Sequence, residues 1–91
     1  TKYVNLSTPY AMKVIDAWSI HGNATSSLWA IANTTDDVIS DVTAAASDKD
    51  IDRAADVDDA YDDFAVGDDD LRIDIATAAF TGRIIIAVQF T

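Results

Sequence analysis

The sequence predicts an all-β domain, a small β-sandwich of seven to eight short strands. All 16 acidic residues are aspartate and none is glutamate. Aspartate favours caps and turns, whereas glutamate favours helix interiors. Short apolar runs also recur along the chain between turn signals, a spacing typical of a sandwich or small barrel. A jelly roll is one form that such a sandwich can take.

The clearest strand signals lie near the C-terminus, in residues 70–77 and 82–90. In the first segment, Leu71, Ile73 and Ile75 alternate with polar residues, as expected for a strand with one buried face. The second segment, GRIIIAVQF, is apolar at positions that would face both sides of a sheet. Because a glycine turn signal separates the two runs, we expect them to be neighbouring strands.

The N-terminal half contains two further strand signals. MKVIDAWSIH (12–21) reads as a long strand, and SLWAIAN (27–33) follows after a Gly–Asn turn signal. A short edge strand at 3–6 would be interrupted by Pro9. We therefore divide the chain into an N-terminal arm or edge segment, residues 1–11, and a β-sandwich domain, residues 12–91.

The middle of the chain leaves two interpretations open. Val38, Ile39 and Val42 fit either a helix, with aspartates in its first turn, or a strand followed by a loop of small residues. Residues 51–57 predict another strand, and residues 57–64 fit a corner or a single helical turn.

Size and charge exclude several classes of protein. Ninety-one residues make one domain, and the formal net charge of −10 opposes binding to nucleic acid and to anionic membranes. No apolar run is long enough to span a bilayer as a helix. With one histidine and no cysteine there is no Cys/His zinc cage, and no catalytic motif occurs. We expect no enzymatic activity and no cofactor.

A run of aspartates suggests a calcium site, and the spacing then argues against it. The pattern D-x-D-x-D begins at Asp48, like the first ligands of a calcium loop. The sixth and twelfth positions of that loop need glycine and glutamate, but here they hold Arg53 and Asp59. We therefore predict no metal ligand. In a strand, these aspartates would share a solvated face opposite Ile51.

The large aromatic residues and the histidine have simple structural interpretations. Trp18 and Trp29 lie on the two predicted N-terminal strands, and we expect at least one of them in the core because aromatics dominate burial in small domains. His21 lies at a strand end beside a turn, where a surface position is expected.

The pattern of KVIDAWSI, DDVISDVTAAASDKDIDRAADVDDA, VGDDDLRI and a final apolar strand resembles a known family. It is similar to the head decoration, or cement, proteins and related small virion proteins of tailed bacteriophages. The resemblance implies a β-sandwich on the outer capsid surface of the virion, bound to the major capsid protein, commonly as a trimer. It implies no catalytic residues.

Two segments are expected to contact partners. The second face of the C-terminal strand needs cover from another layer or subunit, and a terminal arm is usually ordered only by contact. The expected interface residues are Tyr3, Val4, Leu6, Tyr10, Ile85 and Ala87. Two alternatives stay open: a phage tail or fibre component that binds a receptor or glycan through a tryptophan in an open groove, and an acidic binding domain of a salt-adapted organism.

Overall fold

Eight strands form two antiparallel sheets in the computed structural model, which describes residues 2–22, 26–44, 49, 51–67, 69–76 and 80–91. Sheet A contains, in spatial order, β1 (Lys2–Ser7), β7 (Asp70–Ala76), β3 (Ser27–Asn33) and β4 (Asp36–Ala44). Sheet B contains β2 (Met12–His21), β5 (Ile51–Arg53), β6 (Asp63–Phe64) and β8 (Gly82–Phe90). No helix occurs among the described residues, so the prediction of an all-β sandwich is confirmed.

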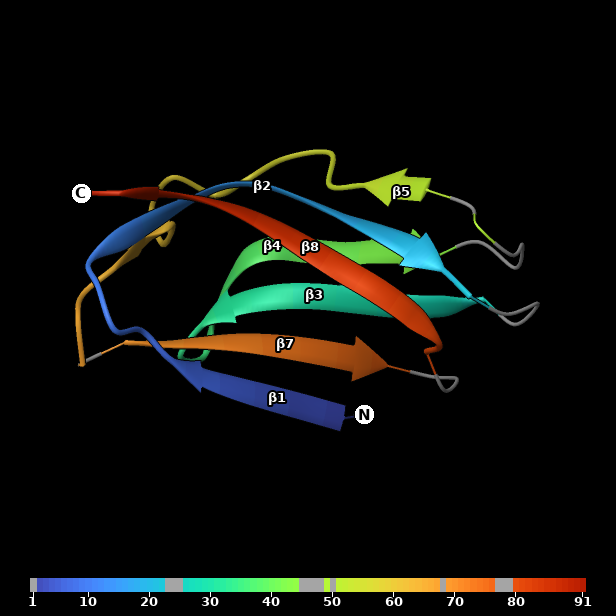
Figure 1. Ribbon diagram of the computed structural model, residues 1–91, viewed down its shortest axis with the longest axis horizontal. Coiled ribbons are helices and arrows are strands. Elements are labelled where there is room, and N and C mark those ends of the chain that lie inside the picture. Colours follow the sequence, from blue (N-terminus) through green and yellow to red (C-terminus); the bar gives the residue numbers. More distant parts are fainter. Residues whose placement is uncertain (1, 23–25, 45–48, 50, 68, 77–79) are drawn as a thin grey trace.

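Sheet B is narrower than sheet A. β2 pairs with β8 along nearly its whole length, and its other edge pairs with the short strands β5 and β6. The prediction that residues 70–77 and 82–90 form neighbouring strands is wrong, because β7 and β8 lie in different sheets. β5 and β8 lie on opposite edges of β2. Because β5 lies close to β4, β8 lies toward the other side of the sandwich, where sheet A has β7 and β1 (Figure 1). No strand of sheet B lies over β1 in Figure 1, so sheet A extends beyond sheet B at this edge.

The core lies between the sheets and draws on both. Trp29 and Ile31 on β3 are fully buried, and Val14 on β2 and Phe64 on β6 meet them from the other sheet. Ile84, Ile86 and Val88 on β8 pack against this cluster from one face of their strand. The expectation that a tryptophan belongs to the core is confirmed for Trp29.

A bulge in β2 changes which residues face inward. The register with β8 shifts between Val14 and Asp16, which leaves Ile15 exposed. Beyond the bulge, the buried face of β2 consists of Ala17, Ser19 and His21. The surface position expected for His21 is wrong: the side chain is buried, and its ring stacks on Phe80 with centroids 5.4 Å apart.

Bulges also explain the ambiguity in the middle of the chain. Residues 36–44 form strand β4, and not a helix. The register between β3 and β4 shifts twice, and Val38 and Ile39 are both buried although they are consecutive. Two consecutive buried residues imitate helical spacing. A two-residue hairpin joins the strands, and Thr34 takes a positive φ of 57° there.

The predicted strand at 51–57 is shorter than expected, and its faces are reversed. β5 covers only Ile51–Arg53. Ile51 is 65% exposed, whereas Asp52 is half-buried and lies opposite the buried Ser19 of β2. The expected solvated aspartate face opposite Ile51 is therefore wrong for Asp52; Asp48 lies outside the described residues.

Candidate interaction surface

The N-terminal segment is a strand of sheet A. β1 pairs with β7, so that Val4 lies opposite Ile73 and Leu6 opposite Leu71. The buried Thr8 hydroxyl then donates a hydrogen bond to the carbonyl oxygen of Ala65 at 2.9 Å. Within the chain, β1 is an edge strand, which is one of the two forms expected for the segment 1–11.

β1 exposes several large apolar side chains. Tyr3 is 59% exposed, Val4 44% and Leu6 50%. Leu71 and Ile73 of β7 pack against the core, so Val4 and Leu6 beside them face the same side of sheet A. Figure 1 shows no strand of sheet B over β1, which explains their exposure. On the outer side, the Arg72 guanidinium lies 4.8 Å from the centre of the Tyr3 ring.

The outer face of sheet B forms a second apolar area, the β8 face, defined by Trp18, Ile20, Ile85 and Ala87. Trp18 pairs with Ile85 across the strands, and all four side chains are half-buried. Their neighbours on the strands point toward the core, which places these four residues on the outside. The same face of β5 adds the exposed Ile51.

One ion pair borders the β8 face. The Nε of Arg53 donates a hydrogen bond to Oδ2 of Asp16 at 2.8 Å, and its guanidinium lies 5.6 Å from the Trp18 ring centre. The hydrogen bond from Arg53 holds the pKa of Asp16 below its usual value, and the Asp16 carboxylate raises the pKa of Arg53. The Asp16 carboxylate beside this face is therefore charged at neutral pH, and Arg53 neutralises it.

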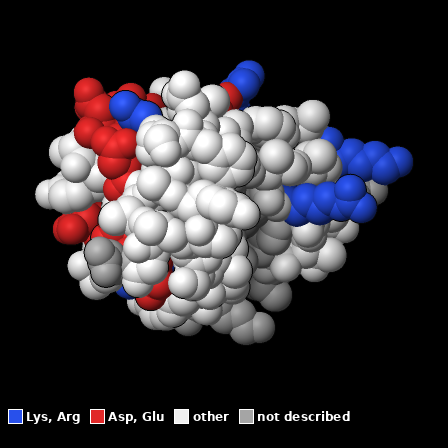
Figure 2. Space-filling model, turned by 60° about the vertical axis from the view of Figure 1, so that its left-hand side comes forward, with Lys and Arg blue, Asp and Glu red and all other residues white. Residues whose placement is uncertain are grey.

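The other aspartates gather elsewhere. Figure 2 shows acidic side chains concentrated toward one side of the view, beside a broad area without charged side chains. A groove of about 660 Å³ lies between β4 and the segment after β5, with one arginine, Arg53, in its wall. Its carboxylates are Asp41, Asp52, Asp56, Asp58 and Asp59.

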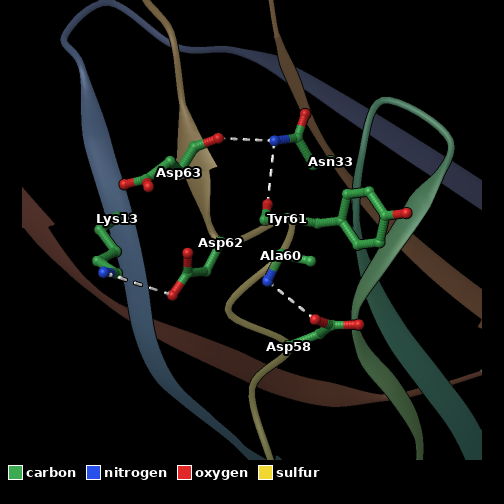
Figure 3. Close-up of polar contacts among 7 residues, drawn as sticks. All are labelled: Lys13, Asn33, Asp58, Ala60, Tyr61, Asp62 and Asp63. Atoms are coloured by element: carbon green, nitrogen blue, oxygen red, sulfur yellow. Dashed lines mark hydrogen bonds and ion pairs between the residues drawn. The ribbon is translucent and has the colours of Figure 1, made fainter.

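A polar network fixes the loop that carries several of these carboxylates (Figure 3). The side-chain amide of Asn33 donates hydrogen bonds to the carbonyl oxygens of Tyr61 and Asp63, at 3.0 and 2.8 Å. The backbone N–H of Ala60 donates to Oδ1 of Asp58 at 2.9 Å. Asparagine at the end of β3 thus attaches the loop to the sandwich.

Asp62 differs from the exposed aspartates of this loop because its carboxylate is buried. Its Oδ2 lies 3.9 Å from Nζ of Lys13. Its Oδ1 has no hydrogen-bond partner among the described residues. No group of three potential metal ligands occurs in the described part of the chain. Asp48 and Asp50 lie outside that part, so their predicted lack of a metal ion stays a prediction.

The structure divides the expected interface residues into three places. Tyr3, Val4 and Leu6 share the edge strand β1, whereas Ile85 and Ala87 lie on the β8 face of the other sheet. Tyr10 lies apart from both, with its ring edge against Phe90 at 5.8 Å between centroids.

Sequence reasoning did not assign Ile20 and Phe90 to an exposed apolar surface, and it placed Trp18 on one only under the receptor- or glycan-binding alternative. Trp18 and Ile20 alternate with the buried Ala17, Ser19 and His21, and this alternation becomes readable only when the bulge at Ile15 is known. Phe90 ends the last strand, and no sequence pattern indicates that it is exposed.

No family model, curated protein or solved structure matches the chain. The described residues contain no helix that could cross a membrane.

Proposed function

We propose that the chain is a structural protein of a tailed-phage virion that decorates the outer surface of the assembled head. The β8 face docks on the major capsid protein. The observation that carries this proposal is the β8 face itself, an apolar sheet surface beside which the Asp16 carboxylate is paired with Arg53. Apolar area of this kind on a small domain marks a protein contact.

The distribution of charge supports the same role. The acidic groove and the β3–β4 hairpin carry aspartates on other parts of the surface. Such a surface repels other decorated particles once the apolar face is docked. A domain that binds the assembled shell and not free subunits stabilises the shell by mass action, without catalysis.

Binding to capsids tests the proposal directly. Undecorated capsids, assembled from the major capsid protein of the same genome, are sedimented with the chain. The wild type is expected in the pellet. Ile85→Lys places a charge in the β8 face and is expected to weaken binding at least about tenfold, because an unpaired charge in an apolar contact costs more than about 1.4 kcal/mol.

Val66→Lys is the matched control, because Val66 is also exposed and lies in a turn away from the β8 face. Its binding is expected to equal that of the wild type. A wild-type chain that stays in the supernatant at every capsid concentration contradicts the proposal. Equal binding by both variants contradicts the assignment to the β8 face.

Receptor or glycan binding is the second candidate. Trp29 is excluded as a platform because it is fully buried. Trp18 supports this candidate, since with Ile51 and Arg53 it lines a shallow hollow of about 210 Å³. Binding to a glycan array that is lost in Trp18→Ala, without binding to capsids, favours this candidate.

Self-association also belongs to the expected role. The resemblance implies three copies at each site on the capsid, and this number stays a prediction for the docked protein. Electron microscopy of decorated capsids measures it.

A further inference from the structure

The open strand edges of the sandwich differ in charge. β4, β5 and β6 each carry at least one aspartate, and charged residues on an edge prevent pairing with another chain. β1 and β8 also border no further described strand, yet neither sequence contains a carboxylate. Each of these strands has one basic residue near its start, Lys2 or Arg83, and the rest of the edge carries no charge that would oppose pairing.

The hydrogen-bonding direction of β1 follows from the ladder beside it. The backbone N–H of Thr34 donates a hydrogen bond to the carbonyl oxygen of Asp70. The backbone N–H and C=O groups of Asp70, and of every second residue after it in β7, therefore point toward β3. The alternate residues of β7 then face β1 and bond to Lys2, Val4 and Leu6. The backbone groups of Tyr3, Asn5 and Ser7 consequently point to the open edge.

We propose that β1 pairs with β1 of a second copy of this chain, antiparallel about a two-fold axis at Asn5, to form one continuous eight-stranded sheet. This inference goes beyond the proposed capsid role and does not depend on it. In this register Asn5 faces its own copy, and Tyr3 faces the partner's Ser7. Val4 meets the partner's Leu6 as a close non-hydrogen-bonded pair.

Self-complementarity and charge identify the occupant as a second copy. The Val4–Leu6 pair is repeated by the two-fold axis, so each copy covers the apolar side chains that the other exposes. Two chains of formal charge −10 repel one another, and they approach at least cost where no carboxylate is present. Two carboxylates of β7 lie on the outer side beside β1, Asp74 opposite Tyr3 and Asp70 opposite Ser7. Asp74 already holds Arg72 in a bidentate pair at 2.6 and 2.9 Å, and Asp70 lies at the end of its strand.

The shape of the sandwich favours β1 over β8 for this contact. Because sheet A extends past β8 on that side, two copies joined at β8 would bring their β1 strands into the same space. Joining at β1 creates no such overlap. A six-residue strand pair is only about 20 Å long, so the interface belongs to the small class and association is expected to be weak and concentration-dependent.

A proline substitution tests the geometry. Asn5→Pro removes an N–H that points to the open edge, so it leaves the β1–β7 bonds in place. Sedimentation velocity over a concentration series is expected to show monomer and dimer for the wild type, and monomer alone for Asn5→Pro. Asn5→Thr keeps the N–H and is the control, with dimerisation expected to be retained.

Leu6→Lys gives a second variant that keeps the whole backbone. It is also expected to be monomeric, with a melting temperature within a few degrees of the wild type, as for an exposed side chain. A wild type that is monomeric at every concentration, or that forms a trimer, overturns the inference. So does unchanged dimerisation in Asn5→Pro and Leu6→Lys.

The capsid experiment separates this inference from the proposed function. Ile85→Lys alters the β8 face and leaves β1 intact, so it is expected to dimerise like the wild type. Loss of dimer in Ile85→Lys with retention in Leu6→Lys would place the self-contact on the β8 face and overturn the assignment to β1.

Discussion

Two phenylalanines on strand ends have opposite surroundings. Phe64 is 2% exposed and packs in the core, whereas Phe90 is 68% exposed and touches Tyr10 edge-to-face. We expect Phe64→Ala to lower the free energy of unfolding by about 3–5 kcal/mol, because it leaves a cavity. Phe90→Ala should cost about 1 kcal/mol. Urea denaturation measures both, and equal losses would contradict the core position of Phe64.

The Asp16–Arg53 pair predicts a change in stability with pH. Because Arg53 lowers the pKa of Asp16 below 3.8, the folded state binds this proton less readily than the unfolded state. The Asp16–Arg53 pair therefore stabilises the fold above the pKa that Asp16 has in the unfolded chain. This stabilisation is lost as the pH falls through the lower pKa that Asp16 has in the folded state. Arg53→Gln should therefore lower the melting temperature, relative to the wild type, by more at about pH 6 than at about pH 2.5.

Arg83→Gln provides the control for this measurement. Arg83 is exposed and forms no ion pair with a described residue, so its substitution should have the same small effect at both pH values. A loss in Arg53→Gln that does not depend on pH would contradict the role of the pair.

At the scale of elements, regular alternation predicted strands and irregular alternation did not. The strands at 12–21 and 27–33 have the predicted bounds, and Leu71, Ile73 and Ile75 identify β7 through their spacing. β4 was ambiguous because its bulges bury Val38 and Ile39 together. A bulge depends on the partner strand, which a single sequence does not reveal.

The candidate surface was predictable only in part for the same reason. The apolar content of β1 and β8 indicated Leu6 and Ile85 as exposed candidates. The position of Trp18 on the outer face depends on the bulge in β2. The position of Arg53 beside it depends on the contact with Asp16, which is 37 residues away in the sequence. Pairings of this kind are set by tertiary structure and leave no local pattern.

The aspartate-rich segment predicts the response to metal removal. The calcium-loop pattern that begins at Asp48 lacks its glycine and its final glutamate, so no ion is expected to be bound. A chelator such as EDTA should change the melting temperature by less than about 1 °C. A decrease of many degrees would show that a bound cation stabilises the fold, and titration with Ca²⁺ would then measure its affinity.

The whole molecule carries a large negative charge, and its response to salt separates two interpretations. Repulsion among the aspartates should be screened as the salt concentration rises. We expect the melting temperature to rise by a few degrees between about 10 mM and about 500 mM NaCl, with the chain folded throughout. A domain of a salt-adapted organism would instead unfold at the low concentration, as circular dichroism would show.

The pairing of first strands with last strands has a consequence for how the chain reaches this structure. β1 pairs with β7, and β2 pairs with β8, so sheet A is completed only after residues 70–76 have been synthesised, and sheet B only after residues 82–90. Contacts so distant in sequence make folding slow, in the range of milliseconds to seconds. A nascent chain therefore carries β1 without its partner strand, and β2 without β8, during most of the synthesis of this domain, and its aspartates would keep such chains apart.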